Sequence, residues 1–223
     1  MNHDFTNKTI IVTGAASGMG RATAIELAKS GATVYAVDRD SSGLKETCDL
    51  SGAKSCEMDI SNAEECNALI KKAKDEQGKL DGLVNFAGVI KRTGLLECTD
   101  EEFDYVMDIN VKACFYLCRA AARQMKTQGI GSIVNISSIW NDIAAPGVFG
   151  YCVSKGAVSQ ITKSAALDLA GTGVRINEVR PGETNTAMLA SERGYKMSQQ
   201  EICLLYTSPS PRDQRGSRMP SSA

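Results

Sequence analysis

A tyrosine and a lysine one helical turn apart are the first side chains in this sequence with a chemistry to offer. The run Tyr151-Cys152-Val153-Ser154-Lys155 is followed by small and apolar residues that favour a helix, so the phenol and the ammonium would project from one face. A free tyrosine has a pKa of about 10, and a nearby cation lowers it enough for acid–base work near neutral pH. A solvated surface pair is the alternative interpretation.

The composition is that of a globular chain and excludes several classes of function. The chain has 223 residues, 43% of them hydrophobic, and a formal net charge of -1, which suits one α/β domain. A charge so close to zero favours neither a nucleic-acid surface nor an anionic membrane surface. No apolar run approaches the roughly 20 residues of a membrane span. Residues 1–8 lack a signal-peptide core, so we expect a cytoplasmic protein.

The cysteines and the single histidine exclude further chemistries. Eight cysteines without a CxxC pair, in a chain without a leader, argue against a disulfide framework. Cys114 and Cys118 lie one turn apart in a helical pattern, and we interpret them as core packing. The one histidine is His3, near the N-terminus. We therefore expect no Ser-His-Asp triad, no Cys-His dyad and no metal site.

Apolar runs and helical patterns alternate along the chain and predict its fold. Strands are expected at residues 8–13, 33–37, 54–58, 83–86, 132–136 and 174–179. Helices are expected at residues 21–30, 42–50, 62–77, 99–126 with a break near Asn110, and 151–171. This alternation calls for a parallel sheet with right-handed crossovers and helices on both faces. The predicted fold is therefore α/β, a Rossmann-type doubly wound parallel sheet in three layers.

The loop between the first strand and the first helix is rich in glycine and suits a dinucleotide phosphate. It reads Thr13-Gly14-Ala15-Ala16-Ser17-Gly18-Met19-Gly20. Gly14 permits a tight turn, Gly18 lets the backbone approach a pyrophosphate, and Gly20 lets the helix pack closely on the strand. The N-terminus of the helix offers free N–H groups to the anion. The spacing differs from the usual GxGxxG, so the strand–loop–helix context supports the interpretation.

Asp38 ends the second predicted strand and favours one cofactor over another. It lies 18 residues beyond Gly20, where a carboxylate accepts hydrogen bonds from the adenosine ribose and repels a 2′-phosphate. We therefore expect NAD rather than NADP. Arg39 follows and is able to bind a 2′-phosphate. The loop residue Ser17 is not basic, however, so it adds no second cation for that phosphate. A plain helix-entry carboxylate is the alternative interpretation of Asp38.

The composition changes abruptly at Cys203. Three of the five prolines fall in the last 21 residues, which have the makeup of a disordered tail. The string also looks like a translated sequencing-library adapter, which would encode its first eleven and its last seven residues around a variable index. We expect residues 1–202 to form the NAD-binding domain and residues 203–223 to be an artefactual or disordered tail. The last strand and helix of the fold would then be missing. The sixth strand would be left as an exposed edge, so an open alternative is that this chain does not fold.

Together these motifs resemble those of the short-chain dehydrogenase/reductase family, over about residues 8–188. They follow the family's order: TGxxxGxG at Thr13–Gly20, acidic residues at Asp38 and Asp59, Asn-x-Ala-Gly at Asn85–Gly88, then Asn110, Ser138, Tyr151, Lys155 and Pro181-Gly182 with Thr186. Ser138 precedes Tyr151 by 13 residues, the usual family interval. Phe86 is a departure, because members usually carry Asn or Ser there.

The resemblance implies hydride transfer between NAD and a secondary alcohol or ketone, and a role for each matching residue. Tyr151 would protonate or deprotonate the substrate oxygen, and Lys155 would lower the pKa of Tyr151 and bind the nicotinamide ribose. Ser138 would hydrogen-bond the substrate oxygen, and Asn110 would hold a water. The implied cofactor contacts are Gly14, Ser17, Gly18, Met19, Gly20, Asp38, Asp59, Ile60, Asn85, Ala87, Gly88, Tyr151, Lys155, Pro181, Gly182, Thr184 and Thr186.

The amino-acid sequence leaves several roles open. Ser137 is a weaker candidate for the role of Ser138, and Trp140 and Phe149 either line the substrate pocket or pack the loop. Sugar acids, polyols and cyclic compounds are all open as substrates. A homo-oligomer, a tetramer or a dimer, is implied for the full-length parent. The alternative function is a non-catalytic dinucleotide-binding or redox-sensing module, which the intact set of catalytic residues argues against.

Overall fold

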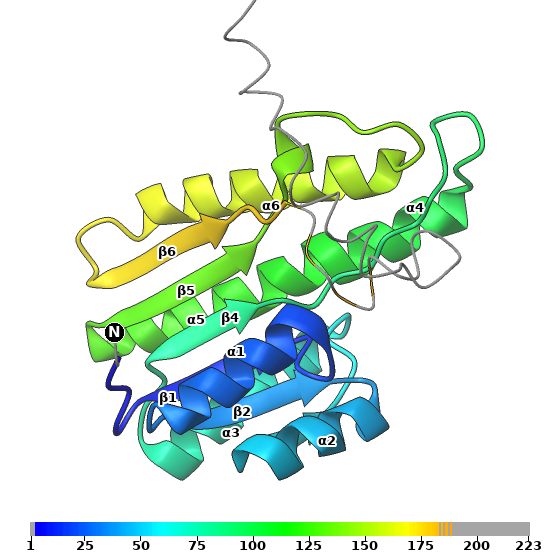
Figure 1. The fold of residues 1–223 in the computed structure, drawn as a ribbon. Coiled ribbons are helices and arrows are strands. Elements are labelled where there is room, and N and C mark those ends of the chain that lie inside the picture. Colours follow the sequence, from blue (N-terminus) through cyan, green and yellow to red (C-terminus); the bar gives the residue numbers. More distant parts are fainter. Residues whose placement is uncertain (1–2, 183, 185, 187, 189–223) are drawn as a thin grey trace, which may run out of the picture.

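The computed structural model describes residues 3–182, 184, 186 and 188 and contains one parallel sheet with helices on both faces (Figure 1). The strand order in this part of the chain is β3-β2-β1-β4-β5-β6. The strands are β1 Thr9–Thr13, β2 Thr33–Asp38, β3 Lys54–Glu57, β4 Gly82–Asn85, β5 Gly131–Ile136 and β6 Val174–Val179. The helices are α1 Gly18–Lys29, α2 Ser41–Ser51, α3 Ala63–Gln77, α4 Asp100–Met107, α5 Ala113–Gln128 and α6 Phe149–Asp168. The predicted α/β, Rossmann-type fold in three layers is confirmed.

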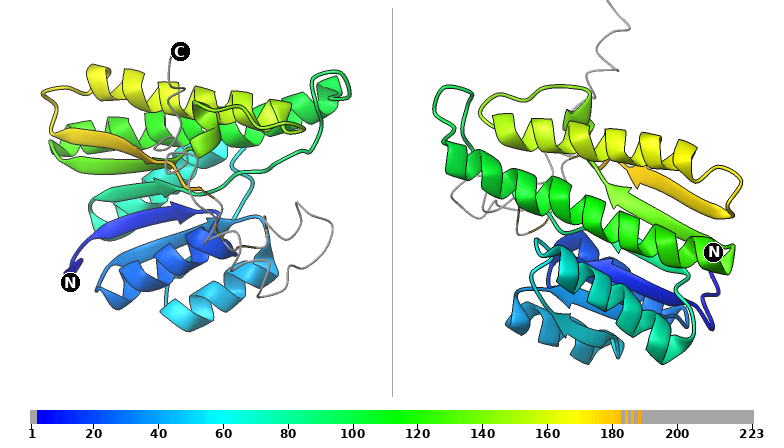
Figure 2. Two further views of the ribbon diagram at one scale, coloured as in Figure 1. Left: turned by 45° about the horizontal axis from the view of Figure 1, so that its top comes forward. Right: turned by 180° about the vertical axis from the view of Figure 1, so that it is seen from behind.

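Alternate residues of the central strands face two separate cores, one on each side of the sheet. Ile11 of β1 and Leu83 of β4 are buried against α3, α5 and α6, which lie side by side in the rear view (Figure 2). Ile10 and Val12 of β1 face the other way, toward α1 and α2. A parallel sheet covered on both faces needs strands that are apolar at nearly every position, and all five residues of β1 are buried.

Several element boundaries differ from the predicted ones. Helix α1 begins at Gly18 rather than at Arg21, so the last glycines of the loop already belong to its first turn. Strand β4 ends at Asn85, which leaves Phe86 beyond the sheet. Helix α6 begins at Phe149, and a short 3-10 turn, η2 Ile139–Asn141, interrupts the predicted loop before it.

The predicted break near Asn110 is a π-helical turn, η1 Asp108–Lys112, between α4 and α5. Thr99 caps α4 as expected, because its hydroxyl accepts a hydrogen bond from the Glu102 N–H at 3.2 Å. The Asn110 side chain bonds both backbone groups of Val89, accepting from its N–H at 2.7 Å and donating to its C=O at 2.9 Å. Such wide turns often occur at functional sites, and this one brings the amide toward the ends of the strands.

The predictions about the C-terminal part of the chain remain predictions. Residues 203–223, and the region in which a further strand and helix were expected to be lacking, lie outside the described residues. In the part that the structure describes, no helix combines the length and the apolar character of a membrane span.

Candidate active site

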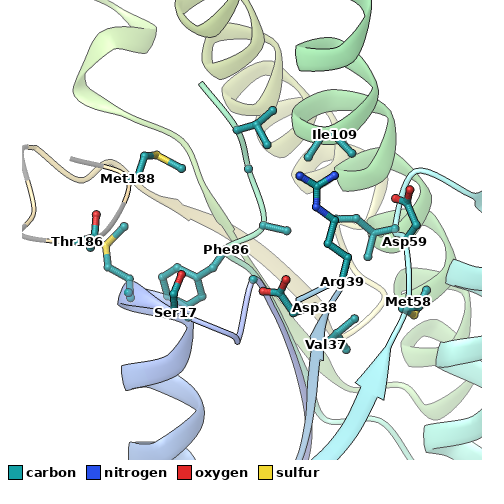
Figure 3. Close-up of a pocket in the computed structure, with 18 residues that line it drawn as sticks. Ser17, Val37, Asp38, Arg39, Met58, Asp59, Phe86, Ile109, Thr186 and Met188 are labelled. Carbon is teal, nitrogen blue, oxygen red and sulfur yellow. The ribbon is translucent and has the colours of Figure 1, made fainter. Parts of the chain in front are cut away.

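A cleft opens at the carboxyl ends of β1, β2 and β4, where the strand order reverses (Figure 3). This is where open α/β sheets bind their ligands. The cleft is lined by Gly14, Ser17, Gly18, Met19, Gly20, Val37, Asp38, Arg39, Met58, Asp59, Ile60, Phe86, Ala87, Gly88, Val89, Ile109, Thr186 and Met188. Most of the predicted cofactor contacts are therefore brought together here.

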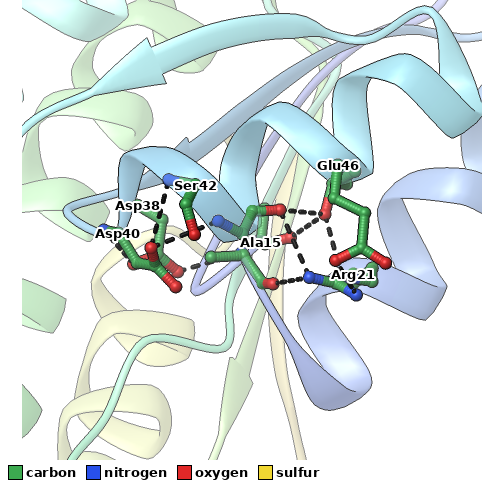
Figure 4. Close-up of polar contacts among 9 residues, drawn as sticks. Ala15, Arg21, Asp38, Asp40, Ser42 and Glu46 are labelled. Carbon is green, nitrogen blue, oxygen red and sulfur yellow. Dashed lines mark hydrogen bonds and ion pairs between the residues drawn. The ribbon is translucent and has the colours of Figure 1, made fainter.

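Side chains from β2, α2 and α1 hold the glycine-rich loop in place (Figure 4). The Asp38 carboxylate accepts a hydrogen bond from the Ala16 N–H at 3.0 Å. Thr47 of α2 donates to the Ala15 carbonyl at 2.8 Å, and the Arg21 guanidinium donates to the Ala16 carbonyl. Three side chains thus fix the loop before any ligand binds, which lowers the entropy that a ligand must overcome.

The glycines of this loop are required by space and by backbone conformation. Gly14 has a φ of +66°, and a Cβ on it would lie 2.7 Å from the Ala87 nitrogen. A Cβ on Gly20 would lie 2.1 Å from the Gly14 carbonyl oxygen. Strand and helix therefore approach each other as closely as predicted.

The donors at the start of α1 fit an anionic group such as a pyrophosphate. Ser17, the N-cap, makes no side-chain capping bond, and the first turn holds no acidic residue. The first N–H groups of a helix have no partners within the helix, and they carry the positive end of its dipole. The cleft beside them is lined by Ser17, Gly18 and Met19, so the residues present suit a dinucleotide.

A second cavity joins the first and contains the predicted acid–base residues. It is lined by Met19, Phe86, Gly88, Ile136, Ser137, Ser138, Ile139, Trp140, Tyr151, Lys155, Pro181, Gly182, Thr184, Thr186 and Met188. Met19, Phe86 and Gly88 also line the first cavity, so a bound molecule is able to extend from one into the other. Phe86, the departure from the family pattern, lies at this junction.

Lys155 lies beneath Tyr151 and is almost fully buried. It is 5% exposed, its Nζ donates to the Ile136 carbonyl at 2.7 Å, and its Nζ is 5.6 Å from the centroid of the Tyr151 ring. Burial disfavours the ammonium and lowers the pKa of Lys155 to about 8. The alternative of a solvated surface pair is thereby wrong for Lys155.

Neither Asn85 nor Asn110 lines the first cleft or the second cavity. Asn85 donates its amide to the Asn135 side chain at 2.8 Å. Asn110 donates to the Ser154 hydroxyl at 2.9 Å. Both asparagines line an inner cavity that Lys155 also lines. The structure therefore places Asn85 in a polar network between strands, because odd positions of β4 face α5, and not against the cleft where a cofactor contact was predicted.

The structure separates the serines and the aromatic residues that the sequence left open. The Ser138 hydroxyl accepts from the Trp140 N–H at 3.1 Å, whereas the Ser137 hydroxyl donates inward to the Lys155 carbonyl at 3.0 Å. Trp140 packs its edge against Tyr151, with ring centroids 6.1 Å apart. Phe149 instead stacks on the Phe103 ring at 6.2 Å. Trp140 therefore lines the pocket, and Phe149 packs α6 on α4.

Several of the remaining lining residues were not predicted. Val37 and Met58 are the last residues of two predicted strands, so the rule that ligands bind at the carboxyl ends of strands would have indicated them. Ile109 reaches the cleft from the π-turn, and no local pattern marks it. Arg39, which the sequence offered as a phosphate-binding residue, also lines the cleft, and its guanidinium donates to the Tyr105 hydroxyl at 2.9 Å.

The lowered pKa of Lys155 predicts how stability depends on pH. Between its pKa of about 8 in the folded chain and the usual 10.5, the unfolded chain binds more protons, so stability rises with pH in this window. Below pH 8 the whole cost of burying the ammonium is present. In urea unfolding, we expect Lys155→Met to gain most over the wild type below pH 8, and this gain should shrink toward pH 10.5. A gain that is independent of pH would contradict the shift.

The chain is similar to known dehydrogenases over most of its length. A family model described as short chain dehydrogenase matches residues 8–196. The chain is 37% identical over 190 residues to the 3beta-hydroxysteroid dehydrogenase of Mediterraneibacter gnavus, covering 82% of this chain and 68% of that one. It is 40% identical over 191 residues to the 2-(R)-hydroxypropyl-CoM dehydrogenase of Xanthobacter autotrophicus, covering 82% and 76%. The structure of an NAD+-bound xylitol dehydrogenase matches with a TM-score of 0.77 at 32% identity, covering 81% of this chain and 72% of that one.

Proposed function

We propose a specific reaction for this chain, which belongs to the short-chain dehydrogenase family and is an oxidoreductase acting on alcohols. The reaction is reversible hydride transfer between NAD and a secondary alcohol or its ketone. The observation that supports it most is the junction of two cavities, one beside the uncapped N-terminus of α1 and the other containing Ser138, Tyr151 and Lys155.

The protein's own groups would bind the substrate oxygen and move its proton. In the oxidation direction, Tyr151 takes the hydroxyl proton of the alcohol while Ser138 holds the oxygen by a hydrogen bond. Lys155 stabilises the phenolate because its ammonium lies 5.6 Å from the Tyr151 ring in a buried site, where charges interact more strongly than in water. Bound NAD would supply the hydride acceptor. The remaining contribution of the site is orientation of the two reactants.

Asp38 supports NAD as the cofactor. It lines the cleft at the end of β2, and its two carboxylate oxygens accept from the Ala16 and Asp40 N–H groups at 3.0 and 3.1 Å. A carboxylate fixed in this way would repel a 2′-phosphate and accept from ribose hydroxyls. Arg39, the neighbouring cation, is engaged with Tyr105.

Removing the charge of Asp38 should weaken the preference for NAD. We expect Asp38→Asn to lower the ratio of kcat/KM for NAD over kcat/KM for NADP by about fivefold, because a charged acceptor contributes about 1 kcal/mol more than a neutral one. The amide oxygen is still able to accept from Ala16. Asp40→Asn is the matched control, since Asp40 caps α2 through Ser42 and Gly43 and does not line the cleft. An unchanged ratio, or a wild type that prefers NADP, would contradict the assignment.

The proposed function is tested by turnover. Purified chain is incubated with NAD and a panel of secondary alcohols that includes cyclic alcohols, polyols and sugar acids, and reduced nicotinamide is followed by absorbance. We expect oxidation of at least one class, with the reverse reaction on the matching ketone. NAD binding without turnover on the whole panel would instead support a non-catalytic dinucleotide-binding module.

We also propose that the protein acts as a homo-oligomer. The exposed Phe115 on α5 supports this, because it is 43% exposed and the Arg119 guanidinium lies 4.7 Å from its ring centroid. Aromatic and arginine side chains are enriched at interfaces between proteins. Light scattering of the purified chain should give a mass of two or four copies, and a monomer would contradict the proposal.

A further inference from the structure

We propose that Asp142 is a positioning residue for the catalytic cavity. Its ion pair with Arg180 would fix the turn η2, which carries Trp140, against Tyr151. The inference rests on the proposed function for its kinetic consequences, but the positioning itself is measurable without turnover.

The Arg180 guanidinium is oriented by hydrogen bonds to groups other than Asp142. Its Nε donates to the Glu178 carboxylate at 2.7 Å, and another of its nitrogens donates to the Ser159 hydroxyl at 3.1 Å. Ser159 in turn donates to Glu178 at 2.8 Å. Ser159 is 3% exposed and the Glu178 side chain is 12% exposed, so β6 and α6 provide a rigid base. A guanidinium oriented in this way loses little further freedom when it binds a carboxylate.

Asp142 connects this base to the segment that follows the turn. Residues 142–148 read Asp-Ile-Ala-Ala-Pro-Gly-Val, so Asp142 carries the one polar side chain among them. The Arg180 guanidinium and the Asp142 carboxylate form an ion pair. Before this segment, a backbone hydrogen bond already attaches the turn to the residues that follow β6, from the Ile139 N–H to the Pro181 carbonyl at 3.1 Å. Asp142 extends that attachment to the far end of the turn.

The turn η2 forms part of the wall of the cavity. The Ser138 hydroxyl caps it by accepting from the Trp140 N–H at 3.1 Å, so Ser138 and Trp140 move as a unit. The indole meets the Tyr151 ring edge-on, at an interplanar angle of 85°. Ser138, Trp140 and Tyr151 all line the cavity. Loss of the Asp142–Arg180 pair would therefore loosen the wall that receives the substrate, while the cofactor cleft keeps its separate braces on the glycine-rich loop.

Asp142→Ala tests the proposal, with Asp49→Ala as a matched control. The Asp49 side chain is 63% exposed and pairs with Lys45 on α2, whereas that of Asp142 is 61% exposed. An exposed ion pair alone has a small effect. Because this pair is anchored in a network, we expect Asp142→Ala to raise the KM for the alcohol about fivefold, which is the upper end of the effect of an exposed ion pair. The KM for NAD should stay unchanged. Asp142→Glu should restore the KM, and Asp49→Ala should leave it at the wild-type value.

A second measurement needs no substrate. Trp140 is the single tryptophan of the chain, so quenching of its fluorescence by acrylamide reports on the turn alone. We expect faster quenching in Asp142→Ala than in the wild type and in Asp49→Ala, at equal thermal stability. Equal quenching in all three proteins would overturn the proposal, as would a rise in the KM for NAD equal to that for the alcohol. If the wild type lacks turnover, the proposed function fails, and the quenching still decides the positioning.

Discussion

Tyr151→Phe should lower the rate of NAD-linked alcohol oxidation by about a hundredfold to ten-thousandfold, which is the usual contribution of a positioned acid–base group to the rate. The substitution removes the phenolic oxygen and keeps the ring. Because Trp140 packs on that ring at 6.1 Å, the wall of the cavity should persist. Calorimetric titration should give the same affinity for NAD as the wild type, so the loss would lie in kcat.

The control for this substitution is Tyr35→Phe. This substitution also removes a hydrogen-bonded hydroxyl, which donates to the Glu76 carboxylate at 2.8 Å. Tyr35 is buried in the core formed with α3, outside both cavities. We expect its turnover to match the wild type. Unchanged turnover in Tyr151→Phe would refute the assignment of Tyr151 as the acid–base residue.

Gly20→Ala should disrupt both the fold and cofactor binding. The added Cβ would lie 2.1 Å from the Gly14 carbonyl oxygen. Because that oxygen belongs to the backbone, α1 must move away from the turn that follows β1. Overpacking of this kind costs about 1–3 kcal/mol of stability. The displacement of the helix N-terminus should also abolish measurable NAD binding, because its N–H groups would form the proposed anion site. Urea unfolding and NAD titration measure the two effects.

A glycine in open surroundings serves as the control. In α6, a Cβ on Gly156 would be 3.7 Å from its nearest neighbour, the Asn141 carbonyl oxygen, which is ordinary contact. Gly156→Ala should therefore stabilise the chain by about 0.5–1 kcal/mol through the lower entropy of the unfolded state. If Gly20→Ala binds NAD as the wild type does, the close approach of helix and strand is not required for the site.

The sequence by itself determined the features that depend on neighbouring residues. Apolar runs and turn residues were sufficient for six parallel strands, since a sheet buried on both faces needs a nearly continuous apolar run in each strand. The glycine-rich loop was readable because its conformation and close packing exclude a Cβ. Tyr151 and Lys155 could be predicted as a pair because one helical turn separates them.

Only the tertiary structure decided the features that join distant segments. Burial of Lys155, which lowers its pKa, comes from α6 packing on β5. The alternation of β4 sends Asn85 into the interior and leaves the cleft to others. Trp140 and Phe149 were equivalent in sequence, and only their contacts assign one to the pocket and the other to packing. The Asp142–Arg180 pair spans 38 positions. No local pattern encodes such contacts, because they depend on where the completed sheet places its loops.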